Sequence, residues 1–109
     1  PETGDRRTNG SLASLAGLEA AQGDSAATEA AIARILMGHA LIASFGGIPL
    51  LYMGDEIGLL NDHSYRSDPA LADAGRWMHR PRMDWDRVAR LGDDSPASHI
   101  HAGVRAILA

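Results

Sequence analysis

The chain has 109 residues, of which 45 % are hydrophobic, and its ten basic and fourteen acidic side chains give a formal net charge of −4. This length suits one small domain and is too short for a complete (β/α)8 barrel of about 250 residues. The acidic balance argues against a nucleic-acid surface, and no apolar run approaches the roughly 18 residues of a membrane helix. The absence of cysteine excludes disulfides and thiolate metal ligands, and it leaves the compartment open.

Two helices are predicted in the first half of the chain. Residues 11–21 place leucines three positions apart, which predicts a short helix with one apolar stripe. The pattern is stronger over residues 25–44, where apolar side chains follow helical spacing after Asp24 or Ser25 as the N-cap. His39 falls on this apolar stripe, and we interpret it as a packing residue rather than a ligand.

A short apolar run of strand length follows the second helix. Residues 48–53 (IPLLYM) lie between a Gly-Gly pair and a Gly-Asp-Glu turn. An apolar run without alternation is typical of a strand buried on both faces, as in a parallel sheet. A helix, such a strand and then a charged loop form one repeat of an α/β barrel, in which the chemistry lies at the carboxyl end of the strands.

Residues 54–97 show little periodicity, and residues 98–109 predict a final helix with Ser95 or Ser98 as its cap. Carboxylates, guanidinium groups and aromatic rings together are the usual lining of a carbohydrate site, although salt bridges that hold a long loop would give the same composition. These groups in the loop are Asp55, Glu56, Asp62, Tyr65, Arg66, Asp68, Asp73, Arg76, Trp77, Arg80, Arg82, Asp84 and Trp85.

Four segments resemble a known group of enzymes. Residues 47–58 (GIPLLYMGDEIG) are similar to the last barrel strand of the α-amylase superfamily, glycoside hydrolase family 13, where the pattern Gly-x-Pro-apolar-x-Tyr-x-Gly-[Asp/Glu]-Glu-x-Gly is characteristic. Residues 3–13, 60–65 and 73–82 resemble the amylosucrases of this superfamily and occur in the matching order. The first motif identifies the superfamily well and the activity poorly.

The resemblance implies an α/β fold, as a fragment of a (β/α)8 TIM barrel with the penultimate helix, the eighth strand at residues 48–53, a long loop and the start of the last helix. It assigns residues 1–23 to the end of the insertion after barrel strand seven, and residues 24–109 to the incomplete C-terminal part of the catalytic barrel. The chain starts without Met and stops inside a helical pattern, so we expect it to be a piece of a longer protein.

The resemblance further implies a retaining glucosyltransferase that cleaves sucrose and transfers glucose to an α-glucan acceptor or to water. Net retention takes two displacements, and therefore one carboxylate nucleophile and a separate acid/base carboxylate. In the family these residues and a third aspartate follow earlier barrel strands, which places them upstream of Pro1, so no catalytic residue is assigned here. Asp55 and Glu56 are expected to orient the loop.

The partners that the resemblance implies are sucrose, an α-glucan acceptor and the remainder of the enzyme. No cofactor or metal is expected, and neither a membrane nor a nucleic acid is expected as a partner. An isolated chain of this kind is expected to be inactive, because the catalytic carboxylates are not on it.

Two arginines match substrate-binding positions of the family. Arg76, directly before Trp77, matches the arginine that pairs with an aspartate at the floor of the glucosyl pocket. Arg7 matches an arginine in the insertion after strand seven that helps to position the acceptor. The pair Arg6-Arg7 and Gly75 depart from the family pattern, which leaves the acceptor preference and the rigidity of the pocket floor open.

Other interpretations fit the same sequence. Arg80 and Arg82 are alternatives to Arg76 if the alignment shifts. A sucrose hydrolase or an α-glucosidase of the same superfamily would carry the same motifs. A third possibility, from another class, is a free-standing helical binding module without chemistry, which should unfold as one cooperative unit.

Overall fold

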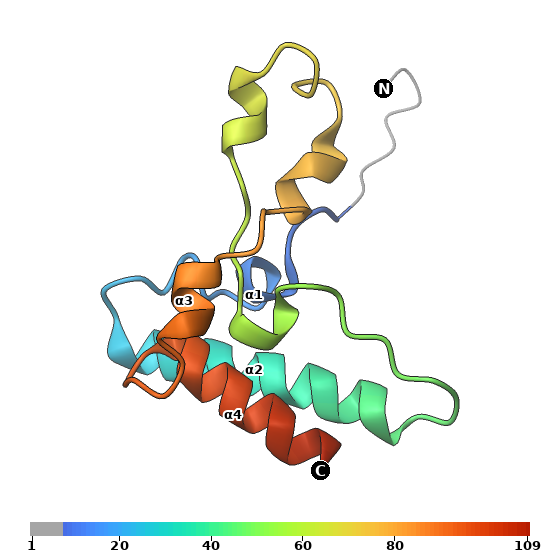
Figure 1. Cartoon of the computed structure of the whole chain (residues 1–109), viewed down its shortest axis with the longest axis vertical. Coiled ribbons are helices and arrows are strands. Elements are labelled where there is room, and N and C mark those ends of the chain that lie inside the picture. Colours follow the sequence, from blue (N-terminus) through green and yellow to red (C-terminus); the bar gives the residue numbers. More distant parts are fainter. Residues whose placement is uncertain (1–7) are drawn as a thin grey trace.

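A computed structural model describes residues 8–109, and they form a helical fold (Figure 1). The two long helices, α2 (Ser25–Ser44) and α4 (Pro96–Leu108), pack against each other along much of their lengths. The short helix α1 (Leu12–Leu15) packs on α2, and α3 (Trp85–Ala89) precedes the turn that leads into α4.

Three short 3-10 helices lie between α2 and α3. The first, η1 (Asp55–Ile57), packs against α4. The other two, η2 (Ser64–Ser67) and η3 (Gly75–His79), lie on a segment that extends away from the helix pair in Figure 1. The segment formed by residues 61–81 is therefore a projection from the helical body.

The predicted α/β fold is wrong. Residues 48–53 are not the eighth strand of a barrel, and no strand or sheet occurs among residues 8–109. A strand is stable where neighbouring strands satisfy its backbone N–H and C=O groups, and this segment has no such neighbour. Its side chains are correspondingly uncovered, since Ile48 is 98 % exposed and Leu50 80 % exposed, and only the half-buried Leu51 packs on the core.

The two longest helix predictions are confirmed, because their start signals are local. The side chain of Asp24 accepts a hydrogen bond from the backbone N–H of Ala27 at 3.0 Å and caps α2. Ser95 caps α4 in the same way, with Pro96 in the first turn, where its missing N–H is not needed. The helix predicted over residues 11–21 is much shorter, because only Leu12–Leu15 are α-helical.

The core lies where α1, α2 and α4 meet. Ile35 and Ile100 are completely buried at its centre, and a second, smaller cluster holds η1 against the first turn of α4. Gly103 permits the close approach of the two long helices, since a Cβ atom there would lie 2.6 Å from both methyl carbons of Leu36. The buried members of the main cluster are Ala13, Leu18, Ala31, Ile32, Ile35, Ile100 and Val104.

Helix α2 is also long and apolar enough to cross a membrane, judged by length and composition alone. Hydrogen bonds from two of its side chains tie it to the segment that precedes it. Arg34 Nη1 donates a hydrogen bond to the carbonyl of Ala16 at 2.8 Å, and Thr28 Oγ1 donates to the carbonyl of Ala21 at 3.1 Å. We therefore interpret α2 as the core helix of this fold, and the expected absence of a membrane partner stays a prediction.

The segment after α2 presents an apolar surface, here called the apolar loop, which is formed by Phe45, Ile48 and Leu50. Phe45 is 76 % exposed, and the neighbouring Leu41 and Ile42 at the end of α2 are exposed as well. Leu41 and Ile42, together with Phe45 and Ile48 of the apolar loop, border a hollow of about 370 Å³. Contiguous apolar surface of this kind favours association in water.

We expect the chain to self-associate through the apolar loop. Replacing Phe45 and Ile48 together by serine should shift sedimentation-velocity profiles toward monomer at concentrations where the unmodified chain associates. Because both side chains are exposed, the helix signal in circular dichroism should stay unchanged. Trp85→Ser removes a similarly exposed side chain elsewhere (70 %) and is the control. An equal effect of Trp85→Ser would show that association is not localised at the loop.

Candidate functional site

The residue with the sharpest predicted role, Arg76, lies on η3 beside an aromatic ring. The guanidinium carbons of Arg76 and Arg80 lie 5.9 and 5.8 Å from the centroid of the Trp77 ring. Both distances are within the range of a cation–π interaction. Arg76 and Arg80 are exposed, and Trp77 is half-buried. We call these three residues the arginine–tryptophan cluster.

Polar contacts from distant parts of the chain hold η3 in place. Asn9 Nδ2 donates a hydrogen bond to the carbonyl of Gly75, and the side chain of Asn9 also bonds to His79. A further bond joins η3 to residue 62, because the N–H of Asp62 donates to the carbonyl of Met78 at 2.8 Å. A Cβ atom at Gly75 would lie 3.0 Å from Asn9 Nδ2, so the glycine leaves room for this contact.

The second predicted substrate-binding residue, Arg7, lies outside the residues that the structure describes. Within residues 8–109, no ion pair joins Arg76 to a carboxylate. The nearby Asp62 is committed elsewhere, because its Oδ1 accepts hydrogen bonds from the N–H and the hydroxyl of Ser64. These bonds, and to a smaller extent the charge of Arg82, hold the pKa of Asp62 below its usual value.

The adjacent carboxylates of η1 have different environments. Glu56 Oε2 accepts a hydrogen bond from the N–H of Gly54 at 2.7 Å and thereby fastens its own turn. Asp55 is half-buried, and its burial raises the pKa of the carboxyl above the ordinary value. The negative charge of Glu56 acts in the same direction, whereas His39 opposes it.

The raised pKa of Asp55 predicts a pH effect on stability. Folding favours the protonated carboxyl, so this stabilisation is fully present below the ordinary pKa of 3.8 and is lost as the pH rises through the higher folded value. Asp55→Asn removes the ionisation. Urea unfolding should therefore show the variant gaining stability relative to the unmodified chain between about pH 3 and pH 7. Asp73→Asn, at an exposed aspartate, is the control, and a relative loss for Asp55→Asn over that range would contradict the prediction.

The structure also reveals a polar residue, Asn61, that no sequence pattern singles out. Asn61 joins the start of the projection to α1, since its Oδ1 accepts from the N–H of Ser11 at 2.7 Å and its own N–H donates to Ser14 Oγ at 2.9 Å. His39 is buried as expected, and its Nε2 has no hydrogen-bond partner among the described residues. No local sequence signal marks Asn61, because its partners are far away along the chain.

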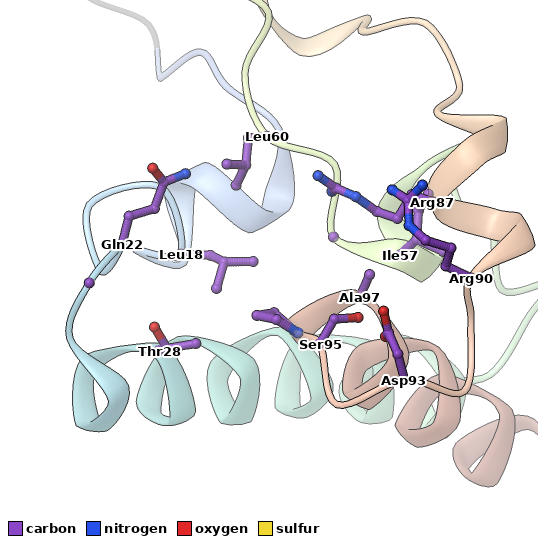
Figure 2. A pocket seen from close by; sticks show the side chains of 13 residues that line it. Leu18, Gln22, Thr28, Ile57, Leu60, Arg87, Arg90, Asp93, Ser95 and Ala97 are labelled. Atoms are coloured by element: carbon purple, nitrogen blue, oxygen red, sulfur yellow. The ribbon is translucent and has the colours of Figure 1, made fainter.

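A pocket of about 380 Å³ lies between the ends of several helices (Figure 2). Its lining comes from the turn before α2, the first turn of α2, η1, α3 and the start of α4. Arg87 and Arg90 lie on the α3 side, and Gln22 and Thr28 lie on the opposite side. Arg76 is not among the lining residues, so the arginine–tryptophan cluster and this pocket are separate sites.

No protein-family model matches the chain. Among residues 8–109, the structure brings together no group of three or more histidine, aspartate or glutamate side chains that could hold a metal ion. The chemistry that the described residues offer at η3 is that of two guanidinium groups beside one flat ring.

Proposed function

We propose that this chain is part of a retaining glucosyltransferase that cleaves sucrose and transfers glucose to an α-glucan. The motif at residues 47–58, followed in order by residues 60–65 and 73–82, supports the proposal from the sequence. The observation that carries it is the arginine–tryptophan cluster, a pair of guanidinium groups at the ring of Trp77. At residues 47–58 the support is the sequence motif alone, because the strand that it predicts at residues 48–53 is absent from the structure.

The cluster suits the binding of a sugar rather than its cleavage. An aromatic face stacks on the apolar face of a pyranose, and planar guanidinium groups donate to hydroxyl oxygens or pair with a carboxylate. In this proposal Arg76 pairs with a carboxylate outside residues 8–109 and closes one end of a glucose-binding pocket. Retaining cleavage needs two carboxylates about 5–5.5 Å apart, and these also come from outside this chain.

The test uses the protein that carries this chain together with its natural flanking sequence. Given sucrose alone, it should release fructose and form glucan, because transfer consumes the glucosyl unit. Equal amounts of free glucose and fructose would instead identify a sucrose hydrolase. Absence of fructose release would overturn the proposal. The 109-residue chain alone should release neither sugar, because the proposal places the catalytic carboxylates outside it.

Arg76 is expected to have a large effect on that activity. Arg76→Ala removes a charge-assisted interaction worth about 1.5–3 kcal/mol, so kcat/KM for sucrose should fall about 10- to 100-fold. Arg66→Ala is the matched control, because Arg66 lies 5.8 Å from the ring centroid of its neighbour Tyr65 in the same kind of contact. A similar loss for both variants would show that Arg76 acts through local structure and not through substrate.

A second candidate function is a helical binding module without chemistry. The helical fold of residues 8–109, with its core between α2 and α4, favours it. This candidate requires that the 109 residues unfold in one cooperative transition and that the longer protein leaves sucrose intact. A broad, probe-dependent transition together with fructose release would exclude it in favour of the glucosyltransferase.

A further inference from the structure

The pocket between α2, α3 and α4 is a candidate binding site apart from the sugar site. Its floor is apolar, because Leu18, Ile57 and Ala97 are buried there and the half-buried Leu60 adjoins them. At about 380 Å³ it falls within the range of pockets that hold small organic molecules. An apolar floor of this size favours a ligand with an apolar body rather than a bare ion.

The polar groups of the pocket are asymmetric in charge. Arg87 and Arg90 contribute two positive charges and Asp93 one negative charge. The carboxylate of Asp93 is already engaged, because its Oδ1 accepts a hydrogen bond from Ser98 Oγ at 2.7 Å. Hydrogen bonds from Ser95 and Ser98 accordingly hold the pKa of Asp93 below its usual value. The lining thus has one positive charge in excess.

The two arginines have donors available for a ligand. The only ion pair that the described residues form with Arg87 uses its Nε, which lies 3.5 Å from Asp84 Oδ2 in a partly exposed contact. Figure 2 shows both arginine side chains on the same side of the pocket, above Ala97 and Asp93. Guanidinium groups bind carboxylates through paired N–H donors, which gives such contacts their geometric specificity.

We propose that this pocket binds a small amphipathic monocarboxylate, with the carboxylate at Arg87 and Arg90 and the apolar body over Leu18 and Ile57. A single negative charge balances the excess positive charge of the lining. A doubly charged phosphate would be repelled by Asp93, and a neutral apolar molecule would leave the remaining guanidinium N–H donors unused.

The test is a titration of the isotope-labelled chain with 3-phenylpropionate, followed by amide resonances in NMR spectra. The residues expected to shift are Ile57, Arg87, Arg90 and Ala97. The neutral analogue 3-phenylpropanamide should bind at least about 10-fold more weakly, since a hydrogen bond to a charged group is worth about 1.5–3 kcal/mol. Inorganic phosphate should also bind more weakly, because it has no apolar body.

Two variants test whether the positive charge of the pocket, and not its shape alone, contributes to the affinity. Arg90→Gln should weaken 3-phenylpropionate binding about 10-fold, and Arg90 is exposed, so the fold should be kept. Arg66→Gln, at an exposed arginine on η2 outside the pocket, should leave the affinity unchanged. Equal binding of the acid and the amide, tighter binding of phosphate, or shifts confined to residues outside the lining would each overturn the proposal.

Discussion

Ile100→Ala should lower the free energy of unfolding by about 2–5 kcal/mol, whereas Ile48→Ala should change it by less than about 0.5 kcal/mol. The substitution is chemically the same at both positions, and only the surroundings differ. Ile100 is completely buried at the centre of the core, and Ile48 is 98 % exposed. Removing the side chain of Ile100 leaves a cavity between α2 and α4, but the exposed side chain of Ile48 has few contacts to lose.

Urea unfolding followed by circular dichroism measures both values. If Ile100→Ala fails to fold, Ile100→Val removes one methyl group and should cost about 0.5–1.5 kcal/mol. The comparison also tests the correction of the fold, because a buried strand at residues 48–53 would make Ile48→Ala as costly as Ile100→Ala. A loss above about 2 kcal/mol at Ile48 would therefore contradict the structure.

Gly58→Ala should be more costly than an ordinary glycine replacement, because it combines backbone strain with a clash. Gly58 has φ +64°, and a Cβ atom there would lie 2.5 Å from Cδ1 of Ile100. The strain costs about 1 kcal/mol, and overpacking adds about 1–3 kcal/mol. Gly23→Ala is the control, since Gly23 also has a positive φ but a Cβ atom there would have no neighbouring atom within 4 Å.

A double-mutant cycle isolates the clash. Ile100→Val deletes the Cδ1 atom that the new methyl group would meet, so Gly58→Ala should cost less when combined with Ile100→Val than in the unmodified chain. Thermal or urea unfolding should show a coupling of at least about 0.5 kcal/mol, as expected for residues in contact. Strict additivity would show that backbone strain alone accounts for the cost.

The long helices could be predicted because their signals are local. Asp24 and Ser95 lie at the caps, and the apolar spacing that follows each of them is a property of the nearby sequence alone. The strand prediction was wrong because the burial of a segment depends on residues that are far away in the sequence. Residues 48–53 have the composition of a buried strand, but composition does not supply the neighbouring strands that such a segment needs.

The candidate site was predictable in part for the same reason. Arg76 and Trp77 are adjacent in the sequence, so their closeness needed no knowledge of the fold. The contacts that hold η3 join residues that are far apart in the sequence, since Asn9 is 66 positions from Gly75 and 70 positions from His79. The pocket with Arg87 and Arg90 likewise forms only when separate helices come together, and no pattern in the sequence marks it.

The projection formed by residues 61–81 has a consequence for how the site behaves. Tyr65 is its one buried side chain, and hydrogen bonds of Asn9, Asn61 and His63 join it to the rest of the fold. Regions with so little buried apolar surface open at free energies well below that of global unfolding, so their amide hydrogens exchange first. The contacts around Trp77 can therefore break and form again while α2 and α4 stay folded and their circular-dichroism signal is unchanged.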